Sequence, residues 1–180
     1  GTYLVDEIHG KINTFADRID DHHIMLFYYK IACLYFGMGD NINCIVYLEK
    51  IINNRSLSMR EDLMCFARVL NLVAHYESSQ DYHLERYLKS TYKFLIKMND
   101  LHEVQREMIR FLRNLDLGNV YPQQIKTEFK KLHKRLKAYE DHPYEKRAYL
   151  YLDIISWLES KIENRPVGDI VREKAQLLGR

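Results

Sequence analysis

Residue types that bind metals and catalyse reactions stand side by side at one place in the chain, Asp21-His22-His23. Aspartate and histidine are common ligands of zinc and of the metal ions of phosphoesterases. A metal site needs side chains that converge, whereas neighbouring residues of a helix point roughly 100° apart. The sequence offers no second Asp/His cluster to supply the missing ligands. We therefore expect this triplet to form a turn and to cap a helix.

Cys33, Cys44 and Cys65 are the candidate nucleophiles. No histidine and aspartate follow them at a spacing from which an activating pair can be inferred. All three lie in apolar stretches, where a free cysteine behaves as a small hydrophobic residue. An odd, sparse set of cysteines is also typical of reduced thiols, so we expect a cytoplasmic protein without disulfides.

The remaining histidines, glycines and acidic residues form no catalytic pattern. His75, His83, His102 and His133 fall on different predicted helices. The chain contains no glycine-rich phosphate loop and no zinc-ligand spacing. We expect no catalytic residue, no metal and no cofactor, and hence no enzyme.

The segment 126–137, KTEFKKLHKRLK, carries six lysines and arginines against one glutamate. Apolar residues lie on the opposite face of the predicted helix. The candidate basic face consists of Lys126, Lys130, Lys131, Lys134, Arg135 and Lys137. Such a face can contact nucleic-acid phosphates or an acidic partner. The simpler interpretation is the solvated face of an amphipathic helix, and a net charge of only +2 favours neither.

The residues between His23 and Ser56 predict two helices folded back on each other. Apolar residues recur there at three- and four-residue steps, which is typical of a buried helical face. Gly37 and Gly39 are expected to end the first helix, and Asp40 or Asn41 to cap the second. A link this short makes the two helices antiparallel.

This hairpin resembles a tetratricopeptide repeat, a 34-residue helix–turn–helix unit. Ala32 matches a small position of that family, Tyr35 an aromatic position and Gly39-Asp40 the turn. In the second helix, Cys44 matches the small position and Leu48 the large apolar position. The chain departs from the family pattern where Ser56 replaces the usual proline and Ile51 replaces a small residue. The resemblance covers this one unit, and its degenerate form is similar to that of bacterial proteins of this kind.

The rest of the sequence predicts more units of the same architecture. We expect one domain over residues 1–180, made of a helix at 3–19 and helix pairs at about 23–56, 58–98, 100–140 and 143–178. Pro143 is expected to start the first helix of the last pair. About nine helices and no strand predict an all-α fold, a right-handed α-solenoid of antiparallel pairs. Gly1 in place of methionine suggests a piece of a longer protein.

The resemblance also implies a binding surface, because the first helix of each tetratricopeptide pair lines the concave face. The corresponding positions are all apolar or aromatic: Leu26, Tyr29, Cys33, Phe36, Phe66, Val69, Val73 and Tyr76. An exposed apolar groove of this size needs a cover. We expect a peptide or helix to fill it, either from a partner or from the same chain. A register shift of one residue would instead place these side chains in the core.

We conclude from the sequence that the chain is a non-catalytic scaffold that binds a peptide or helix of a partner protein. One alternative is a nucleic-acid-binding or regulatory module that uses the basic face. Another is a structural or dimerisation segment of a larger protein, which would form a homo-oligomer. The longest apolar run, 24–36, is interrupted by Lys30 and is too short for a bilayer, so no membrane role is expected.

Overall fold

The structure is a computed structural model of the 180-residue chain. It describes residues 5, 7, 8, 10, 11, 20–54, 61–78, 84–98, 102–116, 118, 121–146, 149 and 153–178. These residues form eight α-helices and a short 3-10 helix, with no strand among them, which confirms the predicted all-α class. The helices are α2 (Asp21–Gly37), α3 (Asn41–Ile52), α4 (Glu61–Glu77), α5 (Leu84–Met98), α6 (Glu103–Asp116), α7 (Ile125–Lys137), α9 (Ile154–Glu163) and α10 (Val167–Leu178), with the 3-10 helix η3 at Pro122–Gln124.

Helices α2 and α3 form the predicted antiparallel hairpin, and its ends follow from local chemistry. Gly39 has a φ of +78°, a left-handed conformation that glycine adopts without a Cβ clash. The Asp40 carboxylate then accepts a hydrogen bond from Asn43 N at 3.1 Å and caps α3. Between the helices, Tyr35 stacks on Tyr47 with ring centroids 5.8 Å apart. The hairpin is therefore held by capping at its turn and by aromatic packing along its length.

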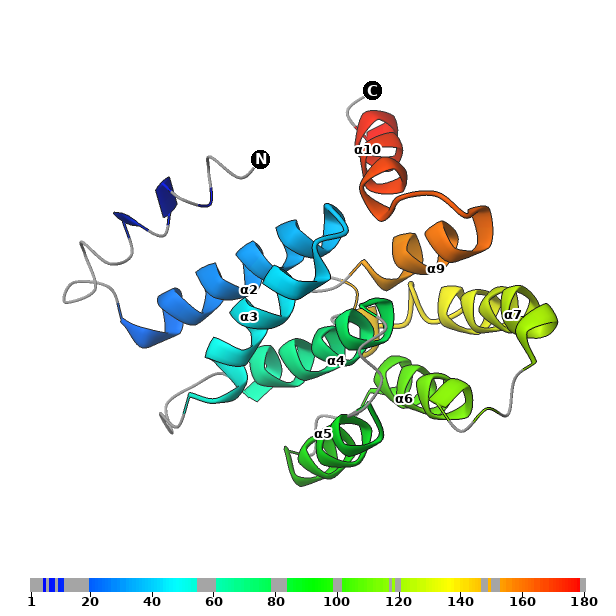
Figure 1. Cartoon of the computed structure of the whole chain (residues 1–180), viewed down its shortest axis with the longest axis horizontal. Helices are drawn as coiled ribbons and strands as arrows, with labels where there is room; N and C mark the ends of the chain where they lie inside the picture. Colours follow the sequence, from blue (N-terminus) through cyan, green and yellow to red (C-terminus); the bar gives the residue numbers. More distant parts are fainter. Residues whose placement is uncertain are drawn as a thin grey trace.

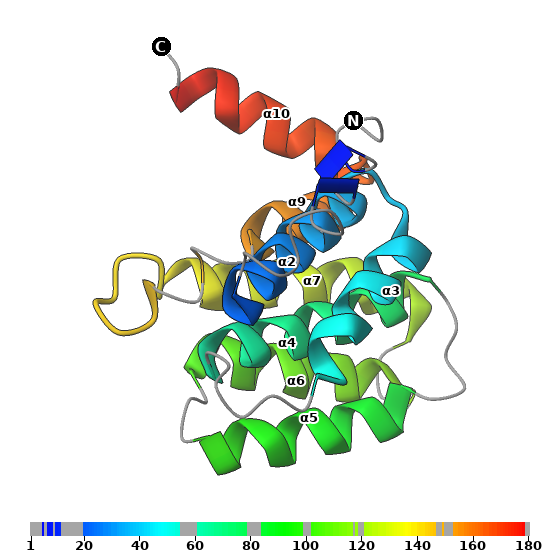
Figure 2. The same ribbon diagram turned by 90° about the vertical axis from the view of Figure 1, so that its left-hand side faces the viewer.

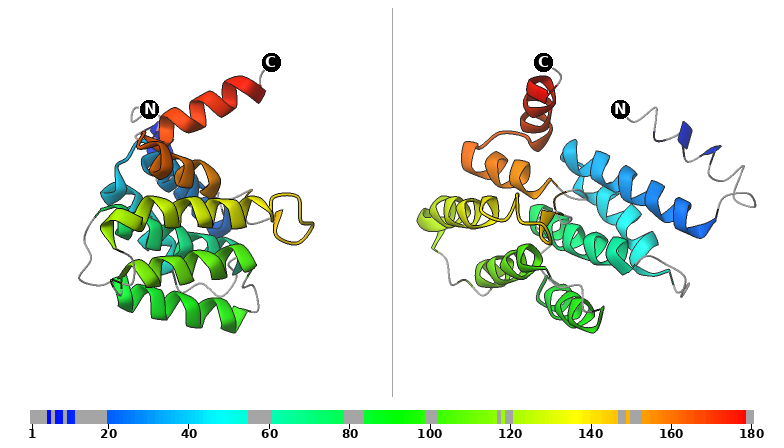
Figure 3. Two further views of the ribbon diagram at one scale, coloured as in Figure 1. Left: turned by 90° about the vertical axis from the view of Figure 1, so that its right-hand side faces the viewer. Right: turned by 180° about the vertical axis from the view of Figure 1, so that it is seen from behind.

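Helix α4 is the centre of the molecule. Every side chain described from Asp62 to His75 is buried except that of Arg68, as expected for a helix packed on more than one side. Figures 1 and 2 show α3 along one flank of α4 and the pair α5 and α6 along another. In the left view of Figure 3, α7, α6 and α5 lie one below the other. The core thus runs from the first hairpin through α4 to these three helices.

The two ends of the described helical series meet. Figure 1 shows the chain passing from α2 through α4 to α5 and α6, then back through α7 and α9 to α10 beside the end of α2. A Cβ added to Gly168 in α10 would lie 2.5 Å from the carbonyl oxygen of Gly37, so the two backbones touch here. A solenoid makes contacts between neighbouring repeats. The contact of α10 with α2 joins helices from opposite ends of this series.

The last predicted pair is only partly described. Pro143 lies in a turn, and Lys146 and Tyr149 are helical, but residues 147, 148 and 150–152 lie outside the described ranges, so the expected helix start at Pro143 stays a prediction. Helix α9 starts at Ile154, where the Asp153 carboxylate accepts a hydrogen bond from Ser156 N at 3.0 Å and caps the helix. The helix predicted at 3–19 lies largely outside the described residues, although Val5 is helical and buried.

Helix α6 is capped from a distant part of the chain. The carboxylate of Glu145 accepts hydrogen bonds from Glu103 N at 3.0 Å and from Val104 N at 3.2 Å. Glu145 is buried, and its charge faces the positive end of the helix dipole. The turn at 143–145 is thus fastened to α6.

Candidate partner-binding surfaces

The apolar stripe that was expected to line an open groove lies in the core. Tyr29, Phe36, Phe66, Val69 and Val73 are buried, with exposed fractions of 7% or less. The other three residues of the stripe are half-buried and pack against the same core: Leu26, Cys33 and Tyr76. A partner has no open access to this stripe.

The chain's own later helices cover part of the stripe. The Tyr76 ring lies 6.4 Å from the rings of both Phe129 in α7 and Trp157 in α9, measured between centroids. Phe66 stacks on His102, just before α6, at 6.5 Å. A cover from the same chain was one of the two occupants anticipated from the sequence. Any surface that binds a partner therefore lies elsewhere on the molecule.

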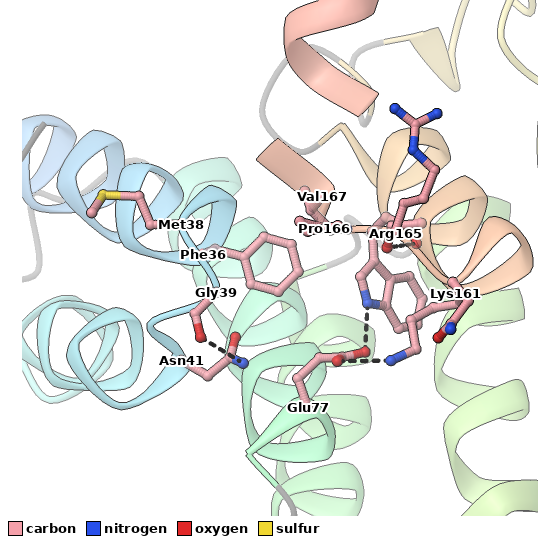
Figure 4. Close-up of a pocket in the computed structure, with 12 residues that line it drawn as sticks. Phe36, Met38, Gly39, Asn41, Glu77, Lys161, Arg165, Pro166 and Val167 are labelled. Atoms are coloured by element: carbon pink, nitrogen blue, oxygen red, sulfur yellow. Dashed lines mark hydrogen bonds and ion pairs between the residues drawn. The ribbon is translucent and has the colours of Figure 1, made fainter. Parts of the chain in front are cut away.

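A polar cavity of about 420 Å³ lies where the α2–α3 turn meets α9 (Figure 4). Glu77, at the end of α4, stands at its edge and accepts hydrogen bonds from Trp157 Nε1 at 2.8 Å and from Lys161 Nζ at 2.9 Å. Phe36 forms an apolar wall. On the opposite side, the buried Oδ1 of Asn41 receives no hydrogen bond from the residues that the structure describes. The charged side chains of the lining are already paired, Lys161 with Glu77 and Arg165 with Glu163 and Glu173.

A groove of about 490 Å³ lies between α5 and α6. Its floor is apolar, formed by the buried side chains of Leu88 and Ile109. Tyr92 stands in the groove wall with 41% of its surface exposed. An apolar floor with an exposed aromatic wall is the usual form of a site for a peptide or helix.

Cations dominate the walls of this α5–α6 groove. Arg106, Arg110 and Arg113 line it from α6, and Lys89 lines it from α5. Glu85 is the one acidic residue of the lining. It pairs with Lys89 at 2.6 Å, and the hydrogen bond from Lys89, together with the charges of Lys89 and Arg113, lowers the pKa of its carboxyl.

The structure divides the predicted basic face of α7 into two parts. Lys131 pairs with Glu128 at 2.6 Å, and Arg135 pairs with Glu107 of α6 at 2.9 Å. The other four lysines are exposed and have no ion-pair partner within the described part of the chain: Lys126, Lys130, Lys134 and Lys137. Their spacing of four, four and three residues places them on one stripe of the helix.

The Asp–His segment at the start of α2 has a structural role. The carboxylate of Asp20 accepts a hydrogen bond from His23 N at 2.9 Å and contacts His23 Nδ1 at 2.8 Å. The cap is thus Asp20, one residue before the predicted triplet, and Asp21 is the first residue of α2. No group of three or more potential metal ligands occurs among the residues that the structure describes.

The three cysteines form no disulfide and lie in or beside the core. Burial raises the pKa of Cys33 to about 12 and also raises the pKa of Cys44. A thiol in this environment stays protonated at neutral pH and is a poor nucleophile. The packing role expected for Cys33 and Cys44 agrees with these positions.

The α5–α6 groove was not anticipated from the sequence. Its signal was present in the spacing of Arg106, Arg110 and Arg113, which lie on one face of a helix. The basic face was instead predicted on the segment 126–137, which carries more lysines and arginines. The polar cavity carries no local signal, because Glu77 and Trp157 are separated by 80 residues.

Comparisons of the chain with protein-family models, with curated proteins and with solved structures found no match. Among the described helices, none combines the length and the apolar character needed to cross a membrane.

Proposed function

We propose that this chain is a non-catalytic interaction module that binds a segment of a partner protein in the α5–α6 groove. The observation that carries the proposal is the combination of a buried apolar floor, Leu88 and Ile109, with the exposed ring of Tyr92. Exposed aromatic side chains beside apolar pockets contribute most of the binding energy in many protein interfaces. The odd, sparse set of three cysteines supports a reducing compartment such as the cytoplasm.

In this proposal the tetratricopeptide-like hairpin α2–α3 serves as a structural unit, and the binding surface lies on another helix pair. The residues first considered for binding lie on α2 and α4 and hold the core together, so these helices supply stability. Helices α5 and α6 provide the binding surface because Tyr92, Arg110 and Arg113, which line their groove, are exposed to solvent.

The test is affinity capture from a lysate of the source cells, with the protein as bait and mass spectrometry as readout. Tyr92→Ala removes the exposed ring of the groove. Tyr121→Ala is the matched control, since Tyr121 is 70% exposed and does not line the groove. We expect the same proteins to be enriched by the parent and by Tyr121→Ala, and to be lost with Tyr92→Ala. Equal enrichment by all three baits would contradict the proposal.

A second candidate function is binding of nucleic acid, and the lysine stripe of α7 favours it. Lys126, Lys130, Lys134 and Lys137 repel one another along the helix, and no described carboxylate pairs with them. A row of phosphates would remove this repulsion and release counterions. The stripe spans about 16 Å at 1.5 Å per residue.

Fluorescence anisotropy with duplex and single-stranded DNA, at about 50 mM and about 200 mM salt, tests this candidate. The variant Lys130→Glu/Lys134→Glu reverses two charges of the stripe. Lys93→Glu/Lys97→Glu on α5 makes the same change at two exposed lysines with the same spacing. Phosphate binding predicts a steep loss of affinity with salt and a loss in the α7 variant alone. Equal loss in both variants would indicate a non-specific effect of net charge.

A further inference from the structure

We propose that the α5–α6 groove is built for an acidic amphipathic helix, whose apolar side chains rest on the groove floor and whose carboxylates pair with Arg106, Arg110 and Arg113. This inference deepens the proposed function and rests on it: it names the chemistry of the partner segment.

The three arginines form a regular row. Their spacing of four and three residues places them on one face of α6, over a rise of about 10 Å. All three line the groove above its apolar floor. A partner helix lying along α6 would match this row if its acidic residues also recur at four- and three-residue steps. The apolar side chains next to those acidic residues would then face Leu88 and Ile109.

The existing partners of these arginines leave charge uncompensated. Arg110 Nη1 contacts Glu107 Oε1 at 2.5 Å, but the other oxygen of that carboxylate is held by Arg135 at 2.9 Å. One negative charge is therefore shared by two guanidinium groups. Arg113 is exposed and has no ion-pair partner among the described residues. A partner carboxylate would neutralise this surplus.

Arg106 retains an unused donor. Its Nε lies 3.2 Å from Glu103 Oε1, close enough for an ion pair. This buried N–H nevertheless has no aligned hydrogen-bond acceptor in the described part of the chain. A buried donor without an acceptor is costly. The Arg106 side chain as a whole is 42% exposed, and guanidinium groups bind carboxylates with two parallel hydrogen bonds, so a carboxylate in the groove can bind its outer nitrogens.

The apolar floor distinguishes a peptide from a polyphosphate. Phosphate backbones gain little from Leu88, Ile109 and Tyr92, whereas the apolar face of a helix is desolvated against them. Glu85, at the rim and already paired with Lys89, adds a repulsive element that disfavours a densely anionic ligand. The positive charge of the arginines and the apolar floor together favour an acidic amphipathic helix as the ligand.

A display library of random peptides of about 16 residues, roughly four helical turns, tests the inference without a known partner. We expect the enriched peptides to carry acidic residues at three- and four-residue spacing, together with an apolar stripe. The selected peptides are then synthesised, and their affinities are measured by fluorescence anisotropy. Glutamine replaces each glutamate in a second set.

The protein variant Arg113→Glu should weaken binding of the selected peptides by roughly tenfold or more, because it places like charges together. Lys93→Glu is the control, with the same change of charge at an exposed position of α5 outside the groove lining. It should leave the affinity within about twofold. Glutamine peptides should lose affinity for the parent. Thermal unfolding of both variants confirms that they fold.

Enriched peptides without acidic bias, or with equal affinity for Arg113→Glu and the parent, would overturn the inference. If such peptides still lose affinity for Tyr92→Ala, the groove binds peptides as proposed, and only the inference of an acidic partner is wrong. A library that yields no peptide sensitive to Tyr92→Ala or Arg113→Glu contradicts both. A duplex oligonucleotide that displaces the peptides and loses affinity with Arg113→Glu would assign the groove to phosphates and would also overturn the inference.

Discussion

The indole N–H of Trp157 donates a hydrogen bond to the carboxylate of Glu77, at 2.8 Å, and joins α9 to the end of α4 across 80 residues. Lys161 binds the second oxygen of the same carboxylate at 2.9 Å. Trp157 is fully buried, and its ring packs edge-on against Phe129. A single acidic side chain therefore fastens the last part of the core to its centre.

Replacing Trp157 with phenylalanine should destabilise the protein by about 1–3 kcal/mol. The change removes the N–H donor, leaves one oxygen of Glu77 with a weaker set of partners, and opens a small cavity. The measurement is urea unfolding followed by circular dichroism. Tyr121→Phe, at an exposed site, should have no effect. An unchanged unfolding midpoint for Trp157→Phe would show that the hydrogen bond is not formed.

Truncating Glu145 to alanine should cost about 1–3 kcal/mol of stability, since two N–H groups at the start of α6 lose their acceptor. Glu145→Gln keeps one acceptor oxygen and should cost less. Hydrogen exchange locates the effect: the amides of Glu103 and Val104 should exchange faster in the alanine variant. Protection equal to that of the parent at these two amides would argue against the capping role.

Substituting Gly168 with alanine should loosen α10 from α2, because the new methyl group would lie 2.5 Å from the Gly37 carbonyl oxygen. Overpacking of this kind typically costs about 1–3 kcal/mol. We expect faster hydrogen exchange in α10 and little change in α3. Gly37→Ala is the control, because its methyl group would enter open space. If both variants exchange like the parent, the two helices are not in contact in solution.

The thiols should resist alkylation in the folded protein. At pH 8, a pKa of about 12 in place of 9.0 leaves Cys33 with roughly a thousandfold less thiolate than an exposed cysteine. The raised pKa of Cys33 also makes stability depend on pH. Above about pH 9 the thiol ionises in the unfolded protein but not in the folded one, so the free energy of unfolding falls as pH rises from 9 towards 12. Iodoacetamide labelling with peptide mapping, in buffer and in urea, measures the difference. Fast labelling of Cys33 in buffer would contradict its burial.

The sequence was most informative where structure is decided by residues close together in the chain. The α2–α3 hairpin, its Gly39 turn and its Asp40 cap were predicted because glycine and aspartate act within a few residues of their own position. The start of α9 at Ile154 was missed, because the helical spacing of apolar residues continues across Asp153 in the sequence.

The surfaces were harder to predict, because burial depends on contacts between distant segments. The stripe containing Tyr76 has the composition of a binding groove as well as that of a core. The packing of Phe129 and Trp157 against it decides which of these it is. Likewise, the row from Arg106 to Arg113 becomes a groove wall only once α5 lies beside it.

The hydrogen bond between Glu77 and Trp157 has a consequence for the synthesis of the chain. Tyr76 and Glu77 leave the ribosome long before Trp157, which completes their contacts 80 residues later. During that interval an apolar face of α4 stays in water, and nascent chains with such faces are prone to aggregate. Cotranslational folding of this protein should therefore stall after the first hairpins and finish in a late, cooperative step, with a period of dependence on chaperones before α9 emerges.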